Sequence, residues 1–444
     1  MKPKLLFVLA IFFVGFLCNN VKAYSLNDAV VATLQNNEKI KAAKKELEIA
    51  ILSKPKVVAE FLPNISVELN QTFHKNRNFP SLQQQPTQKY IRYHQGSLIW
   101  HIEQEIYSGG STIAKIAAAA AEINAAYQTY NKKLNEVIYY TIQVYQSVLT
   151  SRECVKVQTQ NVDIAAKHVE KAKIKVNTGE ETKTSLYLAK AAVAEMKSML
   201  EEYKTQQIEV EAYFQFYIGE EVPEKIETID LKKYKVPIFK DFKALVSQKN
   251  PEILTARSTL KASKQGINIA ASGLMPKISL FGQILRQDGP THLGDKLLNS
   301  QIRKDGDTYG IKMIVPIFNR GLNYISISEA RKKEKYAEHA LKDTLNKVQA
   351  DTTSTWQRYI SSGSVYDSSR QAEENHYKTY LSMKAEFEVG AKTIFDVIQR
   401  QKEYNSNTIV RLKKEHENRL ALFKIYQLIG NLPQTIKSDD PVIK

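Results

Sequence analysis

Residues Ser111–Thr178, STIAKIAAAAAEINAAYQTYNKKLNEVIYYTIQVYQSVLTSRECVKVQTQNVDIAAKHVEKAKIKVNT, form a stretch of 68 residues without glycine or proline. A stripe with alternating three- and four-residue spacing runs along it, and 16 of its 19 positions are apolar or aromatic: Ile113, Ile116, Ala120, Ile123, Tyr127, Tyr130, Leu134, Val137, Thr141, Val144, Val148, Ser151, Val155, Gln158, Val162, Ala165, Val169, Ala172 and Val176. A 3.5-residue repeat of this length predicts helices packed side by side in a left-handed supercoil. At full length the helix would measure roughly 100 Å, far too long for an ordinary globular domain.

A second stretch of the same length, Leu322–Val389, is interrupted only by Gly363. Its stripe is less regular, because charged residues occupy matched positions: Arg331, Glu334, Glu338 and Glu373. We therefore expect this second long helix to face a different neighbour or water.

The two long helices belong to an internal duplication that covers about residues 25–430. Motifs recur at an offset of 213 residues early in each half and 211 later: Asn37-Glu38-Lys39-Ile40 with Asn250-Pro251-Glu252-Ile253, Leu62-Pro63-Asn64-Ile65 with Met275-Pro276-Lys277-Ile278, Gly179 with Gly390, and Ile218-Gly219 with Ile429-Gly430. Such self-similarity predicts one structural unit built twice. Two halves with equivalent mechanical roles are unusual for an enzyme with one active site.

Each long helix is expected to end in a hairpin tip, at Gly179 or Gly390, because glycine is the usual left-handed helix stop. Thr393 followed by Asp396 resembles a capping box that starts the returning helix. The expected organisation is a signal peptide at 1–23, a first repeat at 24–219, a linker at 220–235, a second repeat at 236–430 and a C-terminal tail at 431–444. The first repeat is expected to contain short helices, a strand pair at about 63–106, a long helix at 111–178 and a return helix at 182–218. The second is expected to contain a strand pair at about 276–317, a long helix at 322–389 and a return helix at 393–429. The short helices are expected at about 38–60 and 251–272.

Between the short and the long helices, the hydrophobic period changes from 3.6 to 2. In one such run Ile65, Val67 and Leu69 alternate with polar residues, and in another Tyr309, Ile311 and Met313 do so. These runs predict strands of about ten residues, the length that crosses a bilayer when tilted. Polar segments at about 74–90 and 286–307 are expected to be hairpin loops. A membrane-spanning sheet must close, and single-chain barrels have at least eight strands, so four strands per chain predict an oligomer if they meet lipid.

The N-terminus resembles a secretory signal, with Lys2 and Lys4, an apolar stretch at 5–17 and a small-residue cleavage site ending at Ala23. After cleavage only Cys154 remains, so no intramolecular disulfide is expected. The formal net charge is +16, and its lysines are spread along helices between acidic residues. This pattern favours solvated helix faces over a nucleic-acid-binding surface.

The chain resembles the TolC-like outer membrane efflux protein family. Four stretches carry the resemblance: Leu62-Pro63-Asn64-Ile65, Asn250-Pro251-Glu252-Ile253, Val315-Pro316-Ile317-Phe318-Asn319-Arg320-Gly321 and Val389-Gly390-Ala391-Lys392-Thr393-Ile394-Phe395-Asp396-Val397. The resemblance implies a mainly α-helical homotrimer, in which long helical hairpins form an α-barrel and four strands per chain contribute to a shared 12-stranded β-barrel. It implies an exit duct in the outer membrane that extends into the periplasm. The duct would work with a periplasmic adaptor protein and an inner-membrane transporter, in tripartite efflux or type I secretion.

In that family the hairpin tips form the tunnel entrance and meet the adaptor. The matching residues here are Asn177, Thr178, Gly179, Val389, Gly390, Thr393 and Asp396. Better-known members narrow the entrance with aspartates before the second tip, and this chain departs from that pattern. Lys384, Glu386 and Glu388 stand there instead, so a threefold ring of mixed charge and ordinary solvated residues are both open interpretations.

Other functions were weighed against this one. The eight histidines have no metal-ligand spacing, no phosphate-binding glycine loop appears, and no cofactor is expected. The main alternative is a periplasmic coiled-coil adaptor or tether without a pore, and a secreted fibrous protein is a second. The duplicated amphipathic strand pairs favour the channel over both. The sequence does not identify the transported substrate or the partner pump.

Overall fold

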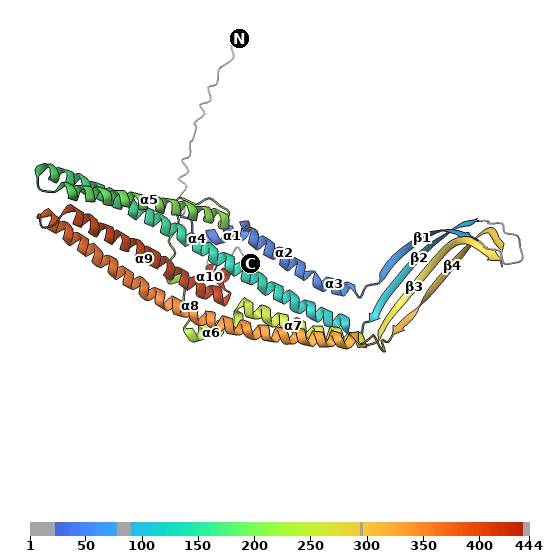
Figure 1. Ribbon diagram of the computed structural model, residues 1–444. Coiled ribbons are helices and arrows are strands. Elements are labelled where there is room, and N and C mark those ends of the chain that lie inside the picture. The colour runs from blue at the N-terminus through green and yellow to red at the C-terminus, as the bar shows by residue number, and fades with distance from the viewer. Residues whose placement is uncertain (1–22, 78–89, 294–295, 438–444) are drawn as a thin grey trace, which may run out of the picture.

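The computed structural model describes residues 23–77, 90–293 and 296–437. The molecule is elongated, with helices along most of its length and a four-stranded sheet at one end (Figure 1). Almost all of the expected signal peptide, residues 1–22, and the last part of the expected tail, 438–444, lie outside the described residues.

The two halves contain matching elements in the same order. The first half consists of α1 (Leu26–Asn36), α2 (Glu38–Ile51), α3 (Ser53–Ala59), β1 (Asn64–Arg77), β2 (Tyr90–Tyr107), α4 (Ser111–Thr178) and α5 (Lys183–Ile218). The second consists of η1 (Leu231–Lys233), α6 (Phe239–Lys249), α7 (Pro251–Ala271), η2 (Ser272–Leu274), β3 (Lys277–Leu293), β4 (Lys296–Ile314), α8 (Leu322–Glu388), α9 (Ile394–Ile429) and α10 (Leu432–Lys437). The helix expected at about 38–60 is divided at Leu52, and α1, α6 and α10 have no counterpart among the expected elements.

The long helix α4 lies between two columns of shorter helices. One column is formed by α5 and α1–α3, and the other by α9 with α6 and α7; α4 contacts members of both. The second long helix, α8, has its main contacts with α6, α7 and α9 and lies at the edge of the helical layer (Figure 1). The difference between the two long helices therefore follows from their neighbours.

Burial along the long helices reflects this arrangement. In α8 the buried residues are Ala337, Val348, Thr352, Thr355 and Phe387, whereas α4 is buried at positions along its whole length. The predicted stripe of α4 is wrong near the sheet, because Ile113 is 73% and Tyr127 50% exposed. There the buried residues are small ones such as Ala114 and Ala118, which allow neighbouring helices to approach closely.

Glu373 of α8 does not face water or an unrelated neighbour. Its carboxylate lies 2.6 Å from Nε of Arg411 in α9, and both side chains are about one-fifth exposed, at 18% and 21%. Arg411 also pairs with Glu415, at 2.9 Å. A charged residue at a stripe position thus connects the second long helix to its return helix.

Replacing Glu373 with alanine is expected to lower the free energy of unfolding by about 1–2 kcal/mol, because a charge-assisted hydrogen bond is lost and Arg411 retains only Glu415. The adjacent Glu374 is the control, since it is exposed and its ion pair is with Lys378 one turn away. Guanidinium unfolding in detergent, followed by circular dichroism, should show a lower midpoint for Glu373→Ala. The midpoint of Glu374→Ala should equal that of wild type. An unchanged midpoint for Glu373→Ala would contradict a stabilising role for its ion pair with Arg411.

In each half, an asparagine joins two short helices end to end. Asn37 caps α2 by accepting from the N–H of Lys39 (3.0 Å), and its amide donates to the carbonyl of Tyr217 near the end of α5 (2.9 Å). Asn250 does the same for α7 and α9, accepting from the N–H of Glu252 (2.9 Å) and donating to the carbonyl of Leu428 (2.7 Å). One side chain satisfies polar groups at both helix ends, and so each column continues along the long helix.

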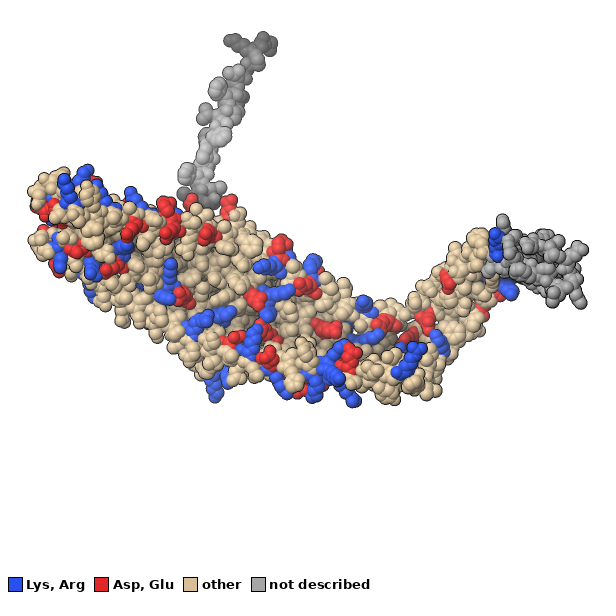
Figure 2. Space-filling model, in the orientation of Figure 1, with Lys and Arg blue, Asp and Glu red and all other residues tan. Residues whose placement is uncertain are grey.

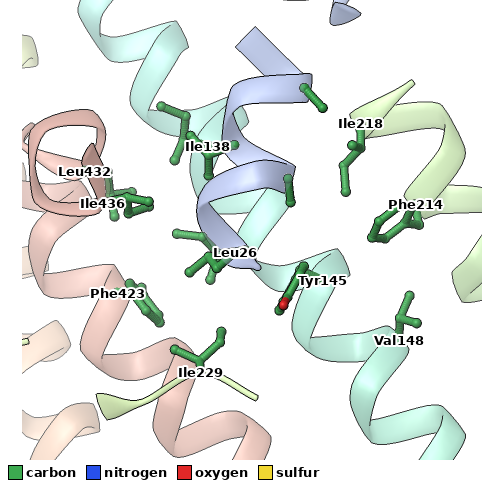
Figure 3. Close-up of a cluster of buried hydrophobic side chains, with 14 of the residues drawn as sticks. Leu26, Ile138, Tyr145, Val148, Phe214, Ile218, Ile229, Phe423, Leu432 and Ile436 are labelled. Atoms are coloured by element: carbon green, nitrogen blue, oxygen red, sulfur yellow. The ribbon is translucent and has the colours of Figure 1, made fainter. Parts of the chain in front are cut away.

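The largest hydrophobic core lies where the two columns change from one helix to the next. There α1, α10 and the segment after α5 cover α4, α5 and α9, with buried Leu26, Tyr145 and Phe423 pointing toward one another (Figure 3). The Tyr145 hydroxyl lies within hydrogen-bonding distance of the carbonyls of Tyr24 (2.8 Å) and Glu227 (2.7 Å). The expected linker at 220–235 is thus held against the core, and its Ile229 is buried.

The sheet is antiparallel with the order β1-β2-β3-β4, and β1 and β4 form its edges. Its strands have 14 to 19 residues, longer than the expected ten. The loop expected at about 286–307 is wrong, because β3 continues to Leu293 and β4 begins at Lys296. Polar residues extend this hairpin because ladder pairing continues from Lys277 with Ile314 to Leu293 with Lys296, with a register shift between Pro290 and Thr291. Most of the loop expected at 74–90 lies outside the described residues.

Candidate functional site

The two helical hairpin tips lie next to each other at the end of the molecule opposite the sheet (Figure 1). At the first tip α4 ends at Thr178, and Gly179 adopts φ +82°, so the N–H of Glu180 reaches the carbonyl of Lys175 at 2.9 Å. This left-handed turn satisfies carbonyls at the helix end. Thr182 then caps α5 through the N–H of Ser185 (3.1 Å).

The second tip repeats this geometry with a stronger cap. Gly390 adopts φ +80°, directly after Val389. Thr393 and Asp396 form a capping box, in which the Asp396 N–H donates to the Thr393 hydroxyl (3.3 Å) and the Asp396 carboxylate accepts from the Thr393 N–H (3.0 Å). The expected tip residues are thus exposed turn residues or cap residues of their own hairpins.

A direct contact between the two hairpins lies just behind the tips, and we call it the seam. It consists of Lys171, Glu181, Phe387, Glu388 and Ile394. Lys171 Nζ lies 3.2 Å from the Glu388 carboxylate, and the Glu181 carboxylate accepts from the Ile394 N–H at 3.2 Å. Phe387 is 1% exposed, and the ammonium of Lys175 lies 4.2 Å from its ring centre. These contacts hold the first hairpin to the second.

The seam borders a buried histidine. His168 of α4 is 6% exposed, and neither ring nitrogen has a hydrogen-bond partner among the described residues. Burial and the nearby ammonium groups of Lys171 and Lys384 lower the pKa of His168 from 6.5 to about 4, against an opposing effect of Glu388. The imidazole is therefore neutral at neutral pH.

The three expected entrance residues lie in the last turns of α8, and all are exposed. Glu388 is engaged by Lys171 in the seam, and Lys384 lies near enough to act on His168. Glu386 is two residues from each, so it points to a different side of α8. The structure thus places both Lys384 and Glu388 near His168, and Glu386 on another side of the helix.

Sequence reasoning missed most of the seam. Lys171, Glu181 and His168 belong to the first hairpin, whereas the expected entrance residues all lie in the second. Phe387 carries a usable signal, because a large apolar residue in the last turn of a largely exposed helix needs a partner outside its own hairpin. No such signal marks Lys171 or Glu181.

The sheet carries a second functional surface, its apolar face. One row across the sheet joins Ile65, Ile102, Gly282 and Tyr309, and the large apolar side chains on this face are exposed: Ile65, Val67, Leu69, Phe73, Trp100, Ile102, Leu280, Ile284, Tyr309, Ile311 and Met313. Alternate residues lie on the opposite face, where His101 approaches Glu68 (3.4 Å) and Lys312 approaches Glu103 (3.5 Å). An exposed apolar face of this size indicates a lipid or protein partner.

Charges limit the apolar face toward the far end of the sheet. Arg286 lies in the row of Leu69 and Leu98, and it pairs with Asp305 (3.7 Å) and Asp307 (3.5 Å) on β4. Elsewhere lysine, arginine and acidic residues are intermixed over the visible face of the helices (Figure 2). Within the described ranges, no group of three or more His, Cys, Asp or Glu side chains could hold a metal ion. None of the described helices is long and apolar enough to cross a membrane.

Comparison with known proteins shows which family has this duplicated architecture. The model of the outer membrane efflux protein family matches residues 29–220 and 244–431, which are the two structural repeats. The chain belongs to the outer membrane efflux protein family. Members of this family are channels, so the periplasmic adaptor or tether is not favoured.

Individual relatives agree with this assignment. The outer membrane efflux protein BepC of Brucella suis biovar 1 (strain 1330) is 20% identical over 345 residues, 76% of this chain and 72% of BepC. The CmeC outer membrane channel of Campylobacter jejuni has the same fold, with a TM-score of 0.77, 16% identity and coverage of 92% of this chain and 86% of CmeC. The outer membrane protein VceC of Vibrio cholerae matches with a TM-score of 0.74, 18% identity and coverage of 92% and 96%. This efflux family member is thus an outer membrane channel that extends into the periplasm.

Proposed function

We propose that three copies of this efflux channel close into one duct, with a 12-stranded barrel in the outer membrane and a helical tunnel in the periplasm. The open sheet supports this proposal. Its edges β1 and β4 are different strands, so β4 of one copy can pair with β1 of the next. A head-to-tail contact of this kind generates a ring. Closure would satisfy the edge backbone groups, as a membrane requires.

The helical layer supports the same closure. Its two flanks, α8 on one side and the α5 and α1–α3 column on the other, carry exposed apolar residues: Tyr324, Ile325, Tyr336, Ile360 and Tyr377 on α8, and Ile49, Leu52, Ile208, Tyr213 and Phe216 on the column. Isolated apolar residues on a surface are normal, but rows on both flanks indicate burial in an assembly. Strand β1 lies on the same side of the molecule as the α1–α3 column, and β4 lies on the same side as α8 (Figure 1). A single rotation between neighbouring copies would therefore bury the flanks and pair the sheet edges.

The hairpin tips are proposed to form the periplasmic entrance. Asn177, Thr178, Gly179, Val389, Gly390, Thr393 and Asp396 would meet a periplasmic adaptor, which would connect the duct to an inner-membrane transporter. Lys384, Glu386 and Glu388 would lie beside the opening. Energy for export would come from that transporter. The seam supports this assignment, since it holds the two hairpins of each copy together at this end of the molecule.

The native mass of the mature protein after detergent extraction from outer membranes tests the assembly. We expect a mass of three chains that is lost only on denaturation, because each copy leaves both sheet edges open. Replacing Ile311 of β4 with proline should prevent assembly, because proline cannot donate to a ladder and is tolerated mainly at free edges. The matched control is Ile311→Val. A water-soluble monomer would contradict the proposal.

A further inference from the structure

His168 occupies an unusual position for a titratable group. It is 6% exposed beside the seam, and within the part of the chain that the structure describes both of its ring nitrogens lack a hydrogen-bond partner. Buried polar groups are nearly always paired, so each exception calls for an explanation. A neutral imidazole tolerates such a site much better than a charged one.

The surroundings of His168 offer little compensation for a positive charge. Lys171 on its own helix and Lys384 on α8 oppose a charge on the ring, and Glu388 on α8 favours it. Glu388 is already paired with Lys171, at 3.2 Å. On either side of His168 along α4, Ala165 and Ala172 belong to a hydrophobic cluster with Phe387, and the return helices contribute apolar residues to that cluster: Ala189, Ala192 and Val193 from α5, and Ile394, Val397 and Ile398 from α9. The carboxylate of Glu181, also in the seam, accepts from the Ile394 N–H.

We propose that His168 makes closure of the entrance depend on pH: a neutral imidazole permits the seam to close, and a protonated imidazole favours separation of α8 from α4. Separation would admit water to the ring and increase its distance from Lys384. This inference rests on the proposed function, because it assigns regulation to the entrance formed by the tips.

The direction and size of the effect follow from proton binding. In the closed seam the pKa of His168 is about 4, and in a separated, hydrated seam it returns toward 6.5. The closed form therefore binds fewer protons, and closure weakens as pH falls through this interval. Linkage gives a shift toward the separated form of about 20-fold per copy at pH 5 and about 120-fold at pH 4, relative to pH 7.

Two measurements on the purified full-length assembly test the proposal between pH 7.5 and 4.5. The first is open probability in planar lipid bilayers. The second is the distance between spin labels on Thr178→Cys and Val389→Cys, in a Cys154→Ser background. Wild type should open and its tips should separate on acidification, whereas His168→Leu, which cannot be protonated, should do neither.

Two further variants serve as controls. His168→Gln keeps a polar side chain without a titrating proton and should behave as His168→Leu, which guards against a folding defect in either. His416 of α9 is half-buried, and its Nδ1 lies 3.4 Å from the Thr150 hydroxyl, away from the tips. His416→Gln should therefore retain the acid response of wild type.

The outcomes are distinct. An acid response that persists in both His168 variants, or wild-type tips that do not separate at low pH, would overturn the role of His168. Absence of conductance at every pH would count against the proposed channel entrance instead. In that case the spin-label distances would still decide whether His168 controls the seam.

Discussion

Replacing Asn250 with alanine is expected to lower the free energy of unfolding by about 3 kcal/mol. Asn250 is 4% exposed and serves two helices at once: it accepts from the first N–H groups of α7 and donates to the Leu428 carbonyl of α9 at 2.7 Å. Alanine removes the cap and takes away the amide donor of the part-buried Leu428 carbonyl. Guanidinium unfolding of the detergent-extracted protein, followed by circular dichroism, measures the loss.

Three further variants separate the two roles of Asn250. Asn250→Asp keeps an acceptor for α7 but faces the Leu428 carbonyl with a second acceptor, so it should also destabilise the protein. Asn37→Ala should behave like Asn250→Ala, since Asn37 makes the equivalent bonds in the first half. Asn268→Ala is the control, because Asn268 is exposed and its side chain donates to Gln265 of its own helix. Equal stability of Asn250→Asp and wild type would mean that donation to α9 contributes nothing.

Replacing Phe387 with alanine is expected to cost about 3–4 kcal/mol of local stability at the seam, as large-to-small changes of buried aromatic residues do. Phe387 is 1% exposed and packs in a cluster formed by all four helices of the two hairpins. Because the cluster is at the tips, the loss should appear as local opening rather than as global unfolding. Hydrogen exchange should accelerate in residues 165–190 and 380–400, and remain unchanged in the mid-length core.

The control for Phe387 is Leu381→Ala, because Leu381 lies on the same helix but is 43% exposed. It should leave exchange at both tips close to that of wild type. Faster exchange confined to the second hairpin in Phe387→Ala would indicate that the two hairpins are not held together through this ring. Equal acceleration in both hairpins is the expected result, and it would establish the seam as one cooperative unit.

The seam and the joining asparagines show different limits of sequence reasoning. Asn37 and Asn250 stand out in the sequence as members of a repeated motif, each directly before an expected short helix, and this position does not reveal the bond that each makes to a second helix. Their second partners, the carbonyls of Tyr217 and Leu428, lie about 180 residues away in the chain. The stripe of α4 likewise indicates a buried helix but does not predict that Ile113 is exposed and Ala114 buried.

The duplicated unit, the extents of the long and return helices and the places of the tips could be read from the sequence. These features depend on hydrophobic period, caps and glycine stops, which act within a few residues. The packing of one hairpin against the other could not be read in this way. The pairing of Lys171 with Glu388, the burial of His168 and the ion pair of Glu373 with Arg411 depend on the lateral position of helices, and periodicity specifies the face of a helix without identifying the side chain it meets.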